Sequence, residues 1–211
     1  MIKVAIIIGS TRPGRKAEAV ARWVYDIANR RGDDDARYEI VDIQEFDLPL
    51  LDEPVPPSMG KYSKPHTKAW SARIDAFDAF VFVTPEYNHG IPAALKNAID
   101  FLYREWNDKA AGFVAYGSAG GTRAVESLRL VMGELMVADV RAQVALSLRT
   151  DFENFSAFKP AAGQELAVNT MLDQLVSWGT ALRAVRRART QDETVPFKPR
   201  AAQTAPAAST A

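Results

Sequence analysis

The sequence opens with Lys3-Val-Ala-Ile-Ile-Ile8, which runs directly into Gly9-Ser-Thr-Arg-Pro-Gly-Arg-Lys16. The first stretch is apolar and β-branched without polar alternation, which is typical of a strand buried on both faces, as in a parallel sheet. After the loop, apolar residues recur at spacings of three and four from Ala17 to Ile27, which predicts an amphipathic helix. The chain therefore begins with a strand, a loop and a helix.

The same alternation continues along the chain. Further strands are predicted at 38–43, 79–83, 111–116 and 140–148, and further helices at 64–76, 93–103, after Gly121, and at 164–187. The proline-dense segment 47–62 is predicted to be a surface loop, and 150–163 to be irregular. The helix after Gly121 has the apolar residues Val125, Leu128, Leu130, Val131, Leu135 and Met136, and the closing helix has Leu166, Met171, Leu175, Trp178 and Leu182. This pattern predicts an open, doubly wound α/β sheet with right-handed crossovers.

Length and composition predict a single compact domain. The chain has 211 residues, of which 47% are hydrophobic, a size that usually forms one core. We expect the domain to span residues 1–190. Residues 191–211 are rich in Ala, Thr, Pro and Ser, a composition that predicts a disordered C-terminal tail.

Charge and cysteine content exclude several classes of partner. The 26 basic and 26 acidic residues balance, which argues against a nucleic-acid or membrane-surface partner. The apolar stretch 4–8 is too short for a signal peptide, and no apolar run approaches the ~20 residues of a membrane span. The chain has no cysteine and two histidines, which fits a cytoplasmic protein without a metal site.

Three informative loops, 9–16, 84–90 and 117–121, each follow a predicted strand. In open α/β sheets, ligands bind outside the carboxyl ends of the strands. The three loops are therefore expected to surround one ligand.

The first loop, 9–16, has the composition of a phosphate site. It combines two glycines, two hydroxyls and three cations just before a helix N-terminus, where free amides and the helix dipole attract an anion. A triphosphate P-loop is disfavoured because Arg15-Lys16-Ala17 provides no hydroxyl for Mg²⁺. The dinucleotide fingerprint GxGxxG also fails, because Thr11 stands at its second glycine. A terminal monophosphate fits best. The alternative for this loop is a glycine turn with solvated arginines, and its position after the first strand favours the phosphate site.

The other two loops can hold a flat ring. Tyr87 can pack beside an isoalloxazine, and we expect the backbone amides of Glu86 to Asn88 to bond its pyrimidine edge, with the Glu86 carboxylate less important. Gly117-Ser-Ala-Gly-Gly121 has no large side chain to obstruct a ring. His89 is more typical of a loop histidine than of a proton donor. Each loop has an ordinary turn as its alternative reading, and their coincidence at one edge favours a ligand.

These motifs also carry a family resemblance. Together, GSTRPGR, PEYNHGIPAALKNAID and YGSAGG resemble the NADPH-dependent FMN reductase family of flavodoxin-like proteins, over residues 3–148. The resemblance implies a flavodoxin-like three-layer α/β sandwich with a five-stranded parallel sheet of order 2-1-3-4-5 and helices on both faces. It also implies bound FMN and a homodimer or homotetramer whose interface lies beside the flavin.

Residue by residue, the resemblance assigns cofactor-binding positions in all three loops. They are Ser10, Thr11, Arg12, Arg15, Lys16, Ala17, Pro85, Glu86, Tyr87, Asn88, Gly117, Ser118 and Gly121. Many relatives have serine or asparagine near positions 16 and 17, where this chain has lysine and alanine. No catalytic side chain and no metal ligand is assigned, because flavin N5 would carry the hydride.

The activity implied is an FMN-dependent NAD(P)H oxidoreductase. NADPH or NADH would reduce the flavin, and a small-molecule acceptor such as a quinone, free flavin or azo compound would reoxidise it. The alternative is a flavodoxin-like electron carrier or redox-sensing module, although such carriers tend to be acidic and this chain is neutral. A third possibility is a fold that has lost its cofactor. Arg104 and Arg123 are expected to lie near the active edge, where they are candidates for recognising a ribose phosphate.

Overall fold

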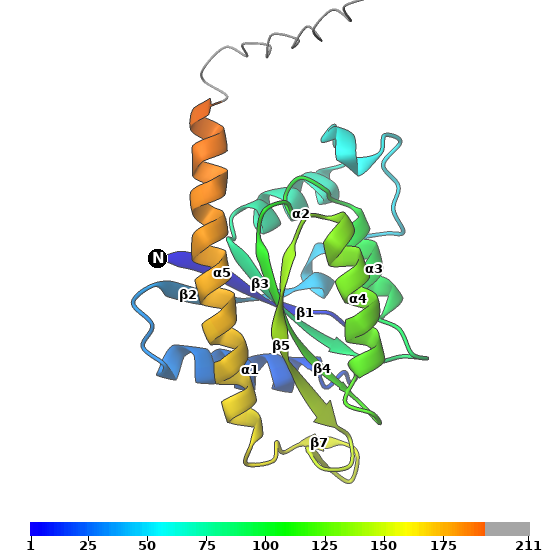
Figure 1. Ribbon diagram of the computed structural model, residues 1–211. Helices are drawn as coiled ribbons and strands as arrows, with labels where there is room; N and C mark the ends of the chain where they lie inside the picture. Colours follow the sequence, from blue (N-terminus) through cyan, green and yellow to red (C-terminus); the bar gives the residue numbers. More distant parts are fainter. Residues whose placement is uncertain (193–211) are drawn as a thin grey trace, which may run out of the picture.

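The computed structural model describes residues 1–192 and contains one five-stranded parallel sheet of order β2-β1-β3-β4-β5, as Figure 1 shows. The sheet strands are β1 (Ile2–Ile8), β2 (Ala36–Asp42), β3 (Ala79–Pro85), β4 (Ala110–Gly117) and β5 (Ala138–Ser147). The helices are α1 (Ala17–Arg30), α2 (Pro65–Asp75), α3 (Ala93–Asp100), α4 (Thr122–Glu134) and α5 (Gln164–Asp192), with short 3₁₀ turns η1 (Ile43–Phe46) and η2 (Pro57–Met59). The remaining strands form a small antiparallel hairpin of β6 (Phe152–Glu153) and β7 (Ala157–Phe158). The predicted flavodoxin-like three-layer sandwich and its strand order are confirmed.

Helices cover both faces of the sheet and enclose two cores. Helices α1 and α5 pack on one face, and α2, α3 and α4 pack on the other (Figure 1). Every residue of β3 and β4 is buried, because both strands are central and covered on both sides. Their continuous apolar runs are therefore the signature expected of inner parallel strands.

The structure corrects several details of the predicted elements. The helix predicted at 93–103 ends as α3 at Asp100, and the segment 150–163, predicted to be irregular, contains the β6–β7 hairpin. Leu130, Met136, Leu166 and Trp178 belong to the predicted apolar sets but are exposed. On α4 the buried stripe is Ala124, Val125, Leu128 and Met132, and a residue two positions after Leu128 lies on the opposite side of a helix.

The C-terminal boundary also differs from the prediction. Helix α5 continues to Asp192, past the predicted helix end at 187 and two residues into the predicted tail. The rest of the predicted disordered tail, 193–211, lies outside the described residues. Within residues 1–192, no helix is both long and apolar enough to cross a membrane.

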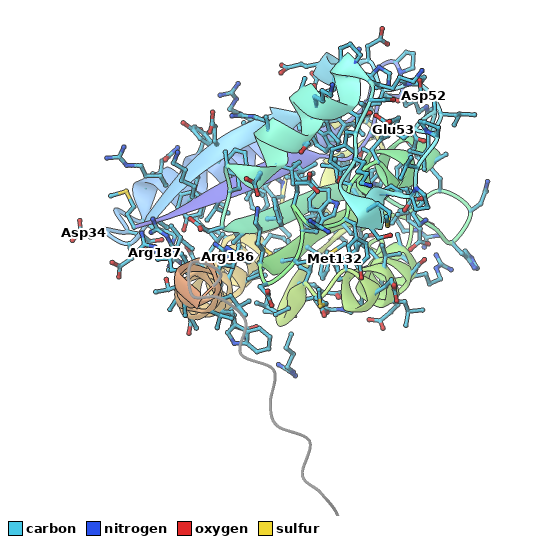
Figure 2. The ribbon with its side chains drawn as sticks, turned by 90° about the horizontal axis from the view of Figure 1, so that it is seen from above. Asp34, Asp52, Glu53, Met132, Arg186 and Arg187 are labelled. Atoms are coloured by element: carbon cyan, nitrogen blue, oxygen red, sulfur yellow. The ribbon has the colours of Figure 1, made fainter. Side chains whose placement is uncertain are left out.

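The amino edge of the sheet is held by charged side chains. Arg186 on α5 donates to Asp78, just before β3, and Figure 2 views this edge from above. Close by, Lys109 is 2% exposed, and its Nζ donates to the carbonyls of Ile74 (3.1 Å) and Asp75 (3.3 Å) at the end of α2. Burial lowers the pKa of Lys109 from 10.5 to about 8, against the opposing charge of Asp75.

The buried lysine predicts a pH-dependent stability. Between about pH 8 and pH 10.5, unfolding takes up a proton at Lys109, so the free energy of unfolding rises with pH by up to roughly 3 kcal/mol from this group. Lys109→Met removes the titrating amine, so the variant does not gain this stability as the pH rises. Its free energy of unfolding relative to that of the wild type should therefore fall across that window. Denaturant unfolding at several pH values measures this, with Lys68→Met, an exposed lysine on α2, as the control. If the free energies of unfolding of Lys109→Met and the wild type differed by the same amount from pH 7 to pH 10.5, the expectation would be contradicted.

Candidate functional site

The loops predicted to form a site meet at the carboxyl edge of the sheet, at the end of the molecule where β7 lies in Figure 1. A cavity of about 300 Å³, within the usual range of small-molecule sites, opens there. Seven of the predicted residues line it, namely Arg12, Arg15, Lys16, Pro85, Glu86, Tyr87 and Gly117. The remaining lining residues are Gly14, Tyr116, Leu148, Phe155 and Ser156. The three loops therefore converge on one cavity, as the sequence predicted.

The β1–α1 loop contains cations in two different environments. Arg15 is nearly buried, with 7% of its side chain exposed, and it pairs with both carboxylate oxygens of Asp42 and with Glu18. Burial opposes its charge, but the hydrogen bonds to Asp42 and Glu18 outweigh burial and raise the pKa of Arg15. Arg12 is exposed, and no side chain in the described part of the protein pairs with its guanidinium. Arg15 thus shapes the loop, while Arg12 is available to an anion.

The hydroxyls of this loop face different surroundings. Ser10 is fully buried, and its Oγ lies 3.3 Å from the Tyr87 hydroxyl, which ties the first loop to the second. Thr11 lines a separate cavity of about 240 Å³ with Ile43 and Asn97. Ala17 is buried at the start of α1. Of the predicted phosphate-loop residues, the structure therefore brings the three cations to the main cavity and places Ser10, Thr11 and Ala17 around it.

The β3–α3 loop corrects the expectation about backbone amides. The Glu86 amide already donates to the Tyr116 carbonyl (2.9 Å), and the Tyr87 amide to the Gly90 carbonyl (3.0 Å). Only the Asn88 amide, of the three, has no acceptor among the described residues. Asn88 and His89 both have positive φ (50° and 69°) in the turn that Tyr87 and Gly90 close. The loop can therefore offer at most one of the three amides to a ligand without rearranging.

The Glu86 carboxylate has a larger structural role than the sequence suggested. Its side chain is 5% exposed, and it accepts from the backbone amides of Arg123 (3.0 Å) and Ala124 (3.3 Å) at the start of α4. The Arg123 guanidinium also pairs with Glu86 and lies 2.8 Å from His89 Nε2. Burial alone would raise the pKa of Glu86, but the hydrogen bonds from Arg123 and Ala124 lower it. Glu86 is therefore an ionised cap of α4, and Arg123 is engaged by the protein itself.

The other arginine suggested for ribose-phosphate recognition lies elsewhere. Arg104 follows α3 and precedes β4, which places it toward the amino edge, and its side chain packs near Gly60. The expectation that it lies at the active edge was wrong, because the crossover helix carries the chain from one edge of the sheet to the other.

The glycines of the β4–α4 loop allow it to pack closely against neighbouring segments. A Cβ on Gly117 would lie 3.2 Å from the Glu86 Cβ. Gly121 has φ 72°, and a Cβ there would lie 2.6 Å from the Ala115 Cβ and 2.8 Å from the Tyr116 nitrogen. Gly121 and the exposed Ser118 adjoin the cavity wall without lining it. The glycines thus allow the loop to pass closely over β4 beside an open cavity.

Sequence reasoning missed Tyr116, Leu148, Phe155 and Ser156 as lining residues. Tyr116 and Leu148 end the predicted fourth and fifth strands, so strand ends were a usable signal. Phe155 and Ser156 lie in the hairpin that was predicted to be irregular, and no local pattern indicates that it folds back over the first loop.

Comparisons with known proteins place the chain among flavin reductases. The family model described as NADPH-dependent FMN reductase matches residues 2–151. An NAD(P)H-dependent FMN reductase, ntnL, of Nectria sp is 42% identical over 159 residues, covering 72% of this chain and 79% of that protein. A quinone reductase of Escherichia coli strain K12 is 32% identical over 137 residues, covering 62% of this chain and 69% of its own. A solved structure with a similar fold is that of FerB, a flavoenzyme NAD(P)H:(acceptor) oxidoreductase from Paracoccus denitrificans. Its TM-score is 0.65 at 19% sequence identity, and the match covers 86% of this chain and 98% of FerB, which supports the fold.

Proposed function

This chain belongs to the NADPH-dependent FMN reductase family and is an FMN-dependent NAD(P)H oxidoreductase, and we propose that it binds FMN in the carboxyl-edge cavity and passes electrons to a quinone or similar acceptor. The observation that carries the placement is the convergence of Arg12, Lys16, Tyr87 and Gly117 on one cavity. Arg12, Lys16 and Tyr87 would hold FMN, which would supply two-electron hydride-transfer chemistry, and the protein would bind and orient the reactants.

The residues present fit the cofactor. Arg12 and Lys16 lie next to the N-terminus of α1, where cations and free amides favour a phosphate. Gly117 lines the cavity without contributing a side chain, and Tyr87 offers an aromatic surface. We propose direct contacts with FMN for Arg12, Lys16, Pro85, Tyr87 and Gly117, and for Asn88 through its backbone amide. We propose indirect roles, through the shape of the surrounding loops, for Ser10, Thr11, Arg15, Ala17, Glu86, Ser118 and Gly121.

Acceptor use is the second part of the proposal. The cavity is a single opening at the sheet edge, so the nicotinamide and the acceptor would occupy it in turn, which predicts ping-pong kinetics. The acceptor would leave with two electrons, a quinone becoming a hydroquinone after taking two protons. The quinone reductase relative supports this class of acceptor.

The experiment is a stopped-flow measurement on the flavin-loaded protein. NADPH and NADH are mixed separately with it, and the expected result is bleaching of the flavin absorbance by at least one of them, followed by recovery when a quinone is added. Free FMN and an azo compound are compared as acceptors in the same experiment. Absence of bleaching with both nucleotides would favour an electron carrier instead, and initial-rate patterns of a ternary complex would contradict alternating use of the cavity.

We further propose that the protein is a cytoplasmic homodimer or homotetramer. Its freedom from cysteine suits a reducing compartment. Exposed apolar side chains, among them Leu130 on α4 (81% exposed) and Leu166 on α5 (72%), are candidates for burial between subunits. Light scattering coupled to gel filtration measures the mass, and a monomer at micromolar concentration would contradict the proposal.

A further inference from the structure

We propose that the β6–β7 hairpin is a second phosphate-binding element, in which Ser156 joins Lys16 in contacting the terminal phosphate of FMN. This inference rests on the proposed function. The hairpin lies beyond residues 2–151, the part of the chain that matches the family model, so the assignment comes from this structure rather than from the match.

The first observation is a contact between segments that are 140 residues apart. Lys16 Nζ donates to Ser156 Oγ over 2.9 Å, and both residues line the cavity. Lys16 is the residue directly before α1, and the first-turn amides and the dipole of a helix favour an anion. The contact therefore brings a hydroxyl to the place where a phosphate is expected.

The second observation is that the phosphate loop itself presents no hydroxyl to this cavity. Ser10 is buried against Tyr87, and Thr11 lines the other cavity. Within the part of the chain that the structure describes, Ser156 is the one serine or threonine that lines the main cavity. A phosphate held by Arg12 and Lys16 would thus find its nearest aliphatic hydroxyl on the hairpin.

The base of the hairpin is firmly held, which fixes the position of its tip. Asp151 is fully buried and accepts from the amides of Ser147 (2.8 Å) and Ala161 (2.9 Å). Phe158 packs edge-on against Trp23 of α1, with ring centroids 5.3 Å apart. A contact from such a pre-positioned element loses little conformational entropy when the ligand binds.

The tip of the hairpin is strained at the residue beside Ser156. The Ser156 amide donates to the Glu153 carbonyl (2.9 Å), and the two residues between them, Asn154 and Phe155, have φ of 50° and 56°. Such turns favour Asn-Gly, and a bulky residue at positive φ is uncommon. Phe155 is nevertheless 66% exposed at the cavity, where its ring can cover the bound cofactor. Strain of this kind often accompanies a functional role.

The test compares FMN with riboflavin, which lacks the phosphate. Flavin fluorescence titrations of the flavin-free protein give Kd for both ligands in the wild type, Ser156→Ala and Lys16→Met. Loss of a hydrogen bond to a charged group raises Kd about tenfold or more. We therefore expect Ser156→Ala to raise the Kd of FMN about tenfold and to leave that of riboflavin unchanged, with a larger effect in the same direction for Lys16→Met.

The control is Lys159→Met, which removes the exposed Lys159–Glu153 ion pair in the same hairpin (2.6 Å) and should change neither Kd. Equal FMN affinity in Ser156→Ala and wild type overturns the inference, as does an equal loss of both ligands, which would indicate a structural role. Failure of the wild type to bind FMN overturns the proposed function as well, so the two failures are distinguishable.

A second variant tests whether the Phe155 ring covers the bound cofactor. Phe155→Gly places a residue suited to positive φ in the turn, so the melting temperature should stay the same or rise, while FMN should dissociate several-fold faster. A purely structural Phe155 would instead leave the dissociation rate of FMN unchanged, and that result would overturn its role as a cover.

Discussion

Replacing Gly121 with alanine is expected to lower the free energy of unfolding by roughly 2 to 5 kcal/mol, through backbone strain and overpacking. Gly121 has φ 72°, and an added Cβ would lie 2.6 Å from the Ala115 Cβ and 2.8 Å from the Tyr116 nitrogen. Both neighbours belong to β4, which is buried along its whole length and cannot move aside. Denaturant unfolding of the two proteins measures the difference.

The matched control lies on the same helix. Gly133 is in α4, and a Cβ there would have no neighbour within 4 Å. Gly133→Ala should therefore be neutral or stabilise the protein by up to about 1 kcal/mol. Equal stabilities for Gly121→Ala and Gly133→Ala would show that the close passage of the loop over β4 is not required.

The same substitution should also impair the cofactor site. Gly121 immediately precedes α4, and the first amides of α4 donate to the Glu86 carboxylate. Glu86 directly precedes Tyr87, and both residues line the cavity. A shift at Gly121 would move these residues together. The FMN content of purified Gly121→Ala should accordingly fall, whereas that of Gly133→Ala should match the wild type.

Arg12→Ala is expected to weaken FMN binding by about 1.5 to 3 kcal/mol, or roughly 10- to 150-fold in Kd, with little change in the free energy of unfolding. The reason is that Arg12 is exposed and has no side-chain partner among the described residues, so its charge is available to the phosphate and contributes little to the fold. Fluorescence titration and denaturant unfolding measure the two quantities. An unchanged Kd would refute the role of Arg12.

Arg15→Ala is the informative comparison, because the two arginines are three residues apart in sequence and differ in their partners. Loss of Arg15 leaves Asp42, which is 14% exposed, without its bidentate partner. We expect a loss of stability of roughly 1 to 3 kcal/mol in addition to weaker FMN binding. If Arg15→Ala left stability unchanged, the division of roles between the two cations would be wrong.

Most of the fold could be predicted from the sequence, because local patterns carry it. The continuous apolar run at 79–83 marks a central strand, and the observed strand β3 is longer by two residues, ending at Pro85. The hairpin at 152–158 could not be predicted, since two-residue strands are too short to show a period. Leu130 is a similar case, because apolar character alone does not tell which side of α4 faces the sheet.

Local patterns in the sequence establish that strands alternate with helices and that three polar loops follow strand ends. The rule for parallel sheets then places those loops at one edge. The contacts of the side chains in these loops depend on how the chain packs in three dimensions. This packing pairs Arg15 with Asp42, it leaves Arg12 without a side-chain partner among residues 1–192, it makes Glu86 a cap of α4, and it brings Ser156 to Lys16. The physical reason is that secondary structure follows from neighbours in the chain, whereas an ion pair or hydrogen bond depends on distances in space, and these are set when distant segments pack together.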